Sequence, residues 1–237
     1  MNKYLVPRDF YNLIADLYDK RYEESVNPSR TKKQVDFIEE HLAPRSSVLD
    51  VACGNGRHSV ELSKRNFNVT GLDTAKGMIL AAQKKASALR IPFVVGDMVN
   101  LPFRSLTFDA AICMWNSLQD ILGAVKRKTA VQEMCRVLKQ AGTVIIDLPN
   151  PYWAEKSRKQ LEEKFRWPRG EDGDYCFEER VGNGKFRVFL HYFTHREVED
   201  ALDEADLRLI ERYGDYSVGP KFLPSESEKC IIVAEQG

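Results

Sequence analysis

The segment Val48–Ser59 constrains the fold of this 237-residue chain more than any other. Its pattern predicts a short buried strand, a turn built on Gly54 and Gly56, and then the start of a helix. Glycine allows backbone conformations that are closed to other residues, and it lets a ligand approach without a Cβ in the way. The helix offers unpaired N–H groups and the positive end of its dipole. The segment therefore predicts a ligand site at a strand–turn–helix unit.

An acidic residue follows this turn at an informative spacing. The apolar run Asn68–Leu72 predicts a second strand that ends in Asp73, 17 residues after Gly56. An acid at the tip of a second strand, about twenty residues beyond a glycine turn, is placed to bind ribose hydroxyls. The dinucleotide fingerprint has a third glycine where this chain has Ser59, and Asp50 at the strand end would repel a pyrophosphate. The pattern therefore indicates an adenosine-containing cofactor with a cationic group.

Five segments carry a resemblance to a known family, and they occur in its order. Asp50–Gly56 resembles motif I of the class I S-adenosylmethionine-dependent methyltransferases, whose cofactor carries an ammonium and a sulfonium group. Gly71–Thr74 resembles their ribose-binding motif, and Val94–Met98 resembles the motif whose acid binds the adenine amino group. Phe108–Cys113 resembles their fourth strand, and Leu138–Val144 the start of their fifth. An unliganded Rossmann-like domain is the alternative.

The resemblance implies a set of cofactor-binding residues. Asp73 would bind the ribose hydroxyls, and Asp97 would bind the adenine amino group unless it only caps the turn after its strand. Asp50 would face the cofactor ammonium or else cap the glycine turn from inside. Arg57 and His58, which open the following helix, are expected to be solvated. The expected cofactor-binding residues are Arg30, Asp50, Ala52, Gly54, Gly56, Asp73, Thr74, Met78, Asp97, Met98 and Met114.

A closer resemblance is to glycine N-methyltransferase and related small-molecule N-methyltransferases. Pro28–Thr31 resembles the segment whose arginine binds the cofactor carboxylate, a task that suits a guanidinium. Arg30 would have this role, or would be a surface arginine. Tyr22 lies where that group places tyrosines around the reacting methyl, and Asn116 lies in a segment that faces substrate; these two are the expected catalytic residues. Residues 149–193 do not match, so glycine as the substrate is unsupported.

Alternating strand and helix patterns predict a single methyltransferase domain with an α/β fold. The sheet is expected to be doubly wound, Rossmann-like and mostly parallel, and the resemblance implies that the last strand is antiparallel. Runs on either side of Gly182–Gly184 predict an inserted β-hairpin after strand five. It is expected to cover the substrate, or else only to extend the sheet. The expected parts are an N-terminal helical arm (1–45), a cofactor-binding half (46–148), the insertion (149–193) and the last helix and strands (194–237).

Three helices have readable boundaries. The patterns predict helices over Lys76–Leu89 and over Arg127–Lys139, the second stopped by Gly142. Thr194 is expected to cap a third helix, with Glu197 in the capping-box position.

Bulk composition sets further limits. The 35 basic and 35 acidic residues balance, so no global field favours nucleic acid or an anionic membrane. The five cysteines show no C-x-x-C pair, so we expect reduced core thiols in a cytoplasmic protein and no metal site. Asn2–Arg8 is too short and polar for a signal peptide, and no run approaches a membrane span. Oligomeric state is not predicted.

The predicted reaction is methyl transfer to a small-molecule acceptor at nitrogen. The sulfonium is a good leaving group, so the enzyme mainly aligns a nucleophile, and an amine needs no strong base. His191 and His195 are expected to be capping or surface residues, although either could serve as a base. Asp147 would hold a cationic substrate or cap the turn after it.

Two other functions stay open. One is methylation of a tRNA base or another nucleic-acid target, and the other is cofactor binding without catalysis. The basic run Lys156–Arg169, interleaved with Phe165 and Trp167, is the one feature that favours RNA. Six acids match the six bases over residues 155–174, so this run is expected to be a solvated amphipathic helix.

Overall fold

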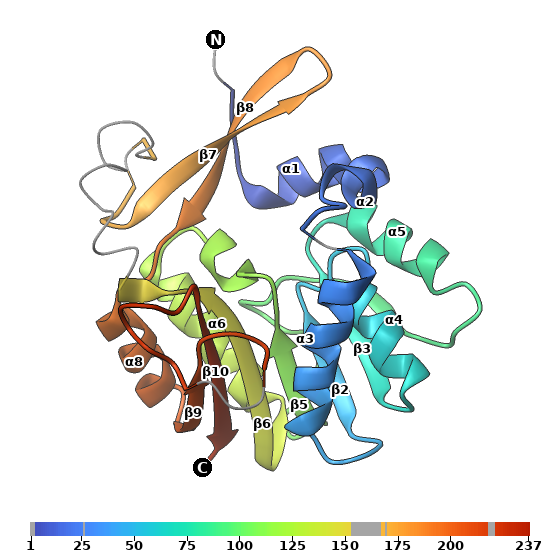
Figure 1. Ribbon diagram of the computed structural model, residues 1–237, viewed down its shortest axis with the longest axis vertical. Helices are drawn as coiled ribbons and strands as arrows, with labels where there is room; N and C mark the ends of the chain where they lie inside the picture. Colours follow the sequence, from blue (N-terminus) through green and yellow to red (C-terminus); the bar gives the residue numbers. More distant parts are fainter. Residues whose placement is uncertain (1–2, 26, 153–166, 169, 218–220) are drawn as a thin grey trace.

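A seven-stranded sheet forms the centre of the molecule (Figure 1). The computed structural model describes residues 3–25, 27–152, 167–168, 170–217 and 221–237. The strand order is β4-β3-β2-β5-β6-β10-β9, with β10 antiparallel to both neighbours and every other pair parallel. The predicted Rossmann-like sheet with an antiparallel last strand is therefore confirmed. Its strands are β2 (Ser47–Val51), β3 (Asn68–Asp73), β4 (Phe93–Val95), β5 (Phe108–Cys113), β6 (Leu138–Pro149), β9 (Leu207–Tyr213) and β10 (Lys229–Gln236).

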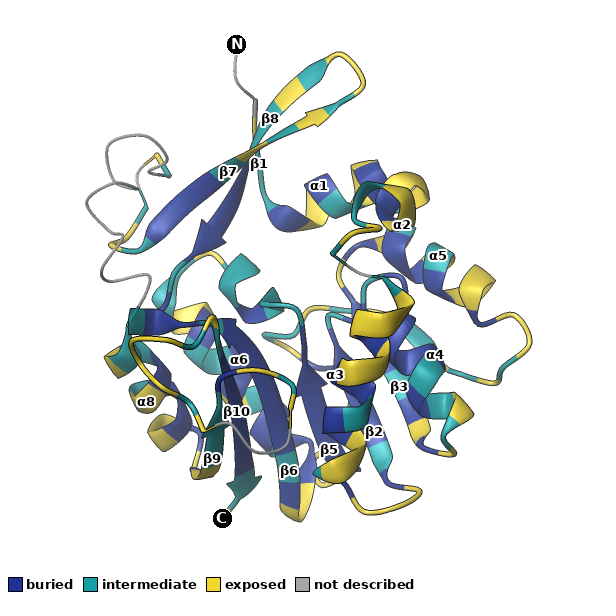
Figure 2. Cartoon of the chain, in the orientation of Figure 1, coloured by how far each residue is buried: buried dark blue, intermediate teal, exposed yellow. Residues whose placement is uncertain are grey.

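The central strands are apolar because helices cover both of their faces. Val48, Leu49 and Ile112 are fully buried, and Figure 2 shows β5, β6 and β10 buried over most of their length. One face packs against α3 (Pro28–Glu40) and α4 (Arg57–Lys64). The other packs against α6 (Ala124–Arg136) and α8 (His195–Glu204), while α5 (Lys76–Lys85) lies beside α4. All five cysteines are free and buried, as expected for core thiols.

Two predicted helix ends were wrong. The helix expected to reach Lys139 ends at Arg136, because the carbonyl of Val137 accepts hydrogen bonds from the backbone N–H groups of Thr107 and Phe108. Leu138 then pairs with Phe108 and starts β6, so strand pairing overrides the helical pattern. Gly142 is a point of close approach rather than a helix stop, since a Cβ there would lie 2.7 Å from the Lys139 carbonyl oxygen.

The helix predicted to run to Leu89 ends at Lys85. In contrast, the third predicted helix begins as expected. Thr194 accepts a hydrogen bond from the Glu197 N–H, and the Glu197 carboxylate accepts one from the Thr194 N–H, which completes the capping box.

A second, three-stranded sheet stands beyond the carboxyl ends of the main sheet (Figure 1). β7 (Asp174–Val181) and β8 (Gly184–His191) form a hairpin around Gly182, which has a φ of 57°. β1 (Lys3–Leu5) pairs parallel with β8. The arm continues through α1 (Pro7–Ile14), η1 (Ala15–Leu17) and α2 (Tyr18–Arg21), so the N-terminal arm and the insertion pack together. Residues 153–166 and 169, which hold the predicted basic run, lie outside the described residues.

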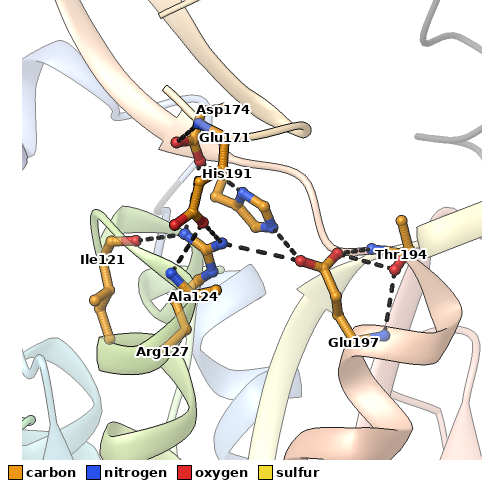
Figure 3. A network of polar contacts seen from close by, with 8 residues as sticks. All are labelled: Ile121, Ala124, Arg127, Glu171, Asp174, His191, Thr194 and Glu197. Atoms are coloured by element: carbon orange, nitrogen blue, oxygen red, sulfur yellow. Dashed lines mark hydrogen bonds and ion pairs between the residues drawn. The ribbon is translucent and has the colours of Figure 1, made fainter. Parts of the chain in front are cut away.

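A buried charged network, drawn in Figure 3, joins the base of this hairpin to α6 and α8. Nδ1 of His191 lies 2.8 Å from Oδ1 of Asp174, and its Nε2 lies 3.2 Å from Oε1 of Glu197. Arg127 lies 3.6 Å from Asp174 and 3.0 Å from Glu171. Although burial alone would lower it, the pKa of His191 is raised because both carboxylates favour the charged ring.

We predict that Asp174→Asn destabilises the protein more at pH 6 than at pH 9. A raised native pKa means that the His191 contribution is complete below its unfolded pKa of about 6.5 and is lost as pH rises through the native value. Removing the Asp174 charge should lower the free energy of unfolding by roughly 3 kcal/mol at pH 6, because Arg127 and the protonated His191 then stay buried without this partner. Urea denaturation at both pH values measures this. The exposed Asp203→Asn is the control, and a cost independent of pH would contradict the assignment.

Candidate active site

The site is a cavity of about 330 Å³ at the carboxyl ends of β2, β3 and β5, and the N-terminal arm forms part of its wall. Its size is at the lower end of the range for small-molecule sites. The cavity brings together eight of the expected cofactor-binding residues, namely Ala52, Gly54, Asp73, Thr74, Met78, Asp97, Met98 and Met114. The other five expected site residues, Tyr22, Arg30, Asp50, Gly56 and Asn116, are not in its lining.

The glycine turn has the left-handed backbone conformation that its sequence predicts. Gly54 and Gly56 have φ values of 55° and 75°, a region that glycine enters at no steric cost. A Cβ on Gly56 would lie 3.0 Å from Ala82 and from the Phe93 ring, so this glycine is required for packing. A Cβ on Gly54 would meet nothing within 4 Å, so this glycine presents open backbone to the cavity.

Asp73 ties the end of β3 to this turn. Its Oδ2 accepts a hydrogen bond from the Gly54 N–H at 2.9 Å, and its Oδ1 accepts one from the Ala75 N–H at 2.8 Å. Burial raises the pKa of the carboxyl, and these two N–H groups act against that shift. A carboxylate has about four acceptor positions, so two bonds leave capacity for a ligand. Its position on the cavity wall suits the ribose hydroxyls.

Asp97 and Asp50 occupy different environments. Asp97 is exposed on the cavity wall, and its Oδ1 accepts a hydrogen bond from the Val99 N–H at 3.1 Å, so it also caps the turn after β4. Asp50 is buried beneath the glycine turn, where it accepts a hydrogen bond from the Ser59 hydroxyl at 2.6 Å. Burial raises its pKa to about 6. This geometry matches the internal capping that was the alternative for Asp50.

Arg57 and His58 are buried, so the prediction that they are solvated was wrong. Arg57 is 8% exposed, and its Nη1 donates to Thr31 at 3.1 Å and to Gln34 at 2.5 Å. Its Nη2 has no hydrogen-bond partner among the described residues, although Arg57 lines the cavity. Burial lowers the pKa of both side chains, and that of His58 falls well below 6.5. α3 covers this helix start, and residue type alone did not reveal that cover.

Three cations surround the Trp115 ring beside the cavity. The Arg57 and Arg30 guanidinium carbons lie 5.1 and 5.5 Å from the ring centroid, and Lys229 Nζ lies 5.6 Å from it. Such distances allow cation–π attraction. The Arg30 side chain is exposed, and its backbone N–H donates to the Asn27 side chain, which caps α3.

Lys229 also forms hydrogen bonds with Asn116 and Asp147, the two residues with predicted substrate roles. Its Nζ donates to the Asn116 Oδ1 and to the Asp147 Oδ1, both at 2.9 Å. Asp147 is fully buried and accepts further hydrogen bonds from the Trp115 N–H and the Tyr216 hydroxyl. Asp147 therefore fastens the turn after β5 and already has a cationic partner.

The N-terminal arm brings different tyrosines to the cavity than expected. Tyr11 and Tyr18 line it, whereas the Tyr22 hydroxyl lies 3.3 Å from the Glu179 carboxylate on β7. Asp19 accepts a hydrogen bond from Asn55 of the glycine turn at 2.5 Å, which holds the arm over the cavity.

Asp120 is a cavity residue that the sequence analysis missed. It ends η2 (Ser117–Asp120), a 3₁₀ turn after β5, and it lies on the cavity wall with Tyr11 and Tyr18. Burial raises its pKa to about 8, and a hydrogen bond from Tyr11 acts against that rise. The sequence did contain one indication of this residue: an acid shortly after β5, at the sheet edge where α/β folds bind ligands.

The remaining histidines lie away from this chemistry. His191 was expected to be a capping or surface residue; it is fully buried in the network of Figure 3, so the surface alternative was wrong. His195 opens α8 and lies 3.0 Å from Glu199. Within the described residues, no group of His, Cys, Asp and Glu is arranged to hold a metal ion, and no helix has the length and apolarity needed to cross a membrane.

The chain matches known proteins over this site. A family model described as a methyltransferase domain matches residues 48–142. A glycine/sarcosine N-methyltransferase of Parasynechococcus marenigrum (strain WH8102) is 33% identical over 230 residues, covering 85% of this chain and 78% of that protein. The chain belongs to the class I S-adenosylmethionine-dependent methyltransferases. It is a methyltransferase, and its cofactor is S-adenosylmethionine.

Solved methyltransferases share its fold. The CcbJ methyltransferase from Streptomyces caelestis superposes with a TM-score of 0.76 at 20% identity, covering 95% of this chain and 97% of that one. S-adenosylmethionine-bound CalS10, an amino pentose methyltransferase from Micromonospora echinaspora, gives a TM-score of 0.62 at 21% identity, covering 93% and 97%.

We predict that Asp73→Ala weakens S-adenosylmethionine binding about ten- to hundredfold. The lost charge-assisted hydrogen bonds to the ribose are worth roughly 1.5–3 kcal/mol, which sets that range. Calorimetry with S-adenosylhomocysteine measures the dissociation constant, and circular dichroism checks that the fold is kept. Asp203→Ala, on an exposed part of α8, is the control. An unchanged dissociation constant would remove Asp73 from the ribose site.

Proposed function

We propose that this methyltransferase transfers the methyl group of S-adenosylmethionine to a nitrogen atom of a small-molecule acceptor. The observation that carries the proposal is the part of the cavity wall that Tyr11 and Tyr18 share with a carboxyl group, that of Asp120. The name of the Parasynechococcus relative, a glycine/sarcosine N-methyltransferase, also supports a nitrogen acceptor.

The bases available in the cavity favour nitrogen over other acceptor atoms. His58 lines the cavity, but burial holds its pKa well below 6.5, so it is a weaker base than Asp120, whose pKa burial raises to about 8. A phenol or a carbon acid would require a stronger base, because its proton must leave before attack. An ammonium ion that has lost one proton is a neutral amine, and its lone pair attacks directly. The supplied methyl group sits on a sulfonium, which leaves readily, so alignment is the main task of the protein.

The cofactor has a consistent place among the described residues. Asp73 would bind the ribose hydroxyls and Asp97 the adenine amino group, with Met98 packing nearby. The open backbone at Gly54 would face the methionine part. Arg57 offers the unpartnered Nη2 beside that turn, so we assign it the cofactor carboxylate in preference to the exposed Arg30. A buried guanidinium binds carboxylates strongly because its donors are poorly satisfied otherwise.

The cover over the cavity would keep water from the methyl group. Arg21 and Tyr22 of the arm contact Glu179 of the hairpin, which joins the two covering segments. Exclusion of water strengthens the electrostatic contacts inside and limits side reactions.

The acceptor atom can be determined with a defined panel. Glycine, sarcosine, ethanolamine and benzylamine represent amines, and catechol and salicylate represent oxygen acceptors. We expect mass spectrometry to find a one-methyl mass gain on at least one amine, with formation of S-adenosylhomocysteine. Bulk tRNA serves as the macromolecular comparison. Methylation of tRNA or of oxygen acceptors alone would refute the proposal.

Arg57 and Arg30 can be separated by comparing two ligands. S-adenosylhomocysteine carries the carboxylate, whereas adenosine does not. We predict that Arg57→Met weakens binding of S-adenosylhomocysteine about ten- to hundredfold and leaves adenosine binding nearly unchanged, whereas Arg30→Met has a smaller effect. Adenosine binding also shows that the variant is folded. The reverse order of the two variants would return the carboxylate to Arg30.

A further inference from the structure

Asp120 has an unusual position for a carboxyl group. It lies on the cavity wall, yet none of the Lys, Arg or His side chains in the described part of the chain forms an ion pair with it. The Tyr11 side chain acts on this carboxyl as a hydrogen-bonding group and lowers its pKa. Asp73 and Asp97, the other cavity acids, both accept hydrogen bonds from backbone N–H groups. A carboxylate that is partly buried without a cation is destabilised, so a bound cation would stabilise it.

The ionisable groups that interact with the charge of Asp120 are themselves acids. Tyr11, Tyr18 and Tyr22 from the arm, Asp73 from β3 and Cys113 from β5 are the ionisable groups that interact with its charge, and none is a cation. η2 also packs against β6, β8 and α6. The buried ionisable groups there are Asp147, His191 and Arg127, which are held in their own ion pairs.

Lys126, at the start of α6, also lines the cavity, but its side chain is exposed. Arg8 of α1 lines it too and is also exposed. Of the three cations around Trp115 only Arg57 lines the cavity, and Asp120 shares the cavity wall with Tyr11 and Tyr18. None of the three cavity cations forms an ion pair with Asp120, so its carboxyl is available to a cationic ligand.

We propose that Asp120, positioned by Tyr11, binds the acceptor as an ammonium ion and takes its proton before methyl transfer. This inference rests on the proposed function, and it names the acceptor class as a protonated primary or secondary amine. The ring faces of Tyr11 and Tyr18 would add cation–π attraction for the ammonium group. Asp120 is then a catalytic residue, since its carboxylate touches the reacting nitrogen.

The steps balance in atoms and charge. The ammonium nitrogen gives one proton to the Asp120 carboxylate, which becomes a carboxylic acid. The freed lone pair on nitrogen forms a bond to the methyl carbon as the bond from that carbon to sulfur breaks, and the electron pair of the broken bond stays on sulfur. The products are the N-methyl ammonium ion and S-adenosylhomocysteine, and Asp120 later releases its proton to water. A base with a pKa of about 8 matches this task near neutral pH.

The test uses methylammonium as a probe on the full chain saturated with S-adenosylhomocysteine. Calorimetry from pH 6 to pH 10 should show affinity rising about tenfold per pH unit below pH 8 and levelling off above it, because only the ionised carboxylate binds the cation. Asp120→Asn should bind methylammonium at least about tenfold more weakly, and its affinity should no longer depend on pH. Asp16→Asn, which changes an exposed acid of the N-terminal arm, should alter neither the affinity nor its pH dependence. Equal affinity in wild type and Asp120→Asn would overturn the proposal.

A second variant keeps the proposal falsifiable if Asp120→Asn does not fold. Because the Tyr11 hydrogen bond lowers the pKa of Asp120, Tyr11→Phe should move the midpoint of the binding profile to higher pH. A midpoint that stays or falls would contradict the positioning role. The pH profile of kcat/KM should shift in the same direction for any amine that the acceptor panel identifies.

The two proposals fail in different ways. If amines are methylated but Asp120→Asn keeps the wild-type binding and pH profile, the role of Asp120 is wrong and the acceptor class stands. If only oxygen acceptors are methylated, the nitrogen acceptor is wrong, and the Asp120 base role with it. Unchanged S-adenosylhomocysteine binding in each variant shows that the cofactor half is intact.

Discussion

The rest of the site depends on the two hydrogen bonds that backbone N–H groups donate to Asp73. They fix the end of β3 against the glycine turn on one side and against the start of α5 on the other. The turn itself has positive φ at Ala52, Gly54 and Gly56, which an isolated chain would seldom adopt. Because the buried Asp73 carboxylate accepts both of these hydrogen bonds, it stabilises that conformation before a ligand binds. Binding then requires little rearrangement, and preorganisation of this kind strengthens affinity.

Around that fixed point the cavity wall carries charges of both signs. Its cations are the buried Arg57, over the Trp115 ring, and the exposed Arg8 and Lys126, and its acids lie at the ends of β3, β4 and η2. Asp147 holds Lys229 and the turn after β5 in place, so one internal ion pair supports the position of the indole ring. A ligand with a carboxylate at one end and positive charge further along would complement this arrangement.

The sheet and the cofactor edge could be predicted from the sequence because each depends on local patterns. Continuous apolar runs give buried parallel strands, and the glycine turn and Asp73 follow from their spacing. The burial of Arg57 and His58 could not be predicted, since it depends on α3 packing over them from 23 to 26 residues upstream. The end of α6 was misjudged for a similar reason, because pairing between Leu138 and Phe108 overrides a helical pattern. Asp120 gave only a weak signal, since its role needs the arm tyrosines beside it.

The parallel pairing of β1 with β8 has a consequence for how the protein is made. The first described strand forms its ladder with Phe186, Arg187 and Val188, so the two partners are separated by most of the chain. During synthesis the beginning of the chain emerges long before its partner exists, and contacts of such sequence separation form slowly. The cofactor half has by then been synthesised in full, from β2 to β6. The N-terminal arm therefore takes its final position late. Until then, a nascent chain has the strands and turns of the cofactor half but lacks the part of the cavity wall that the arm supplies.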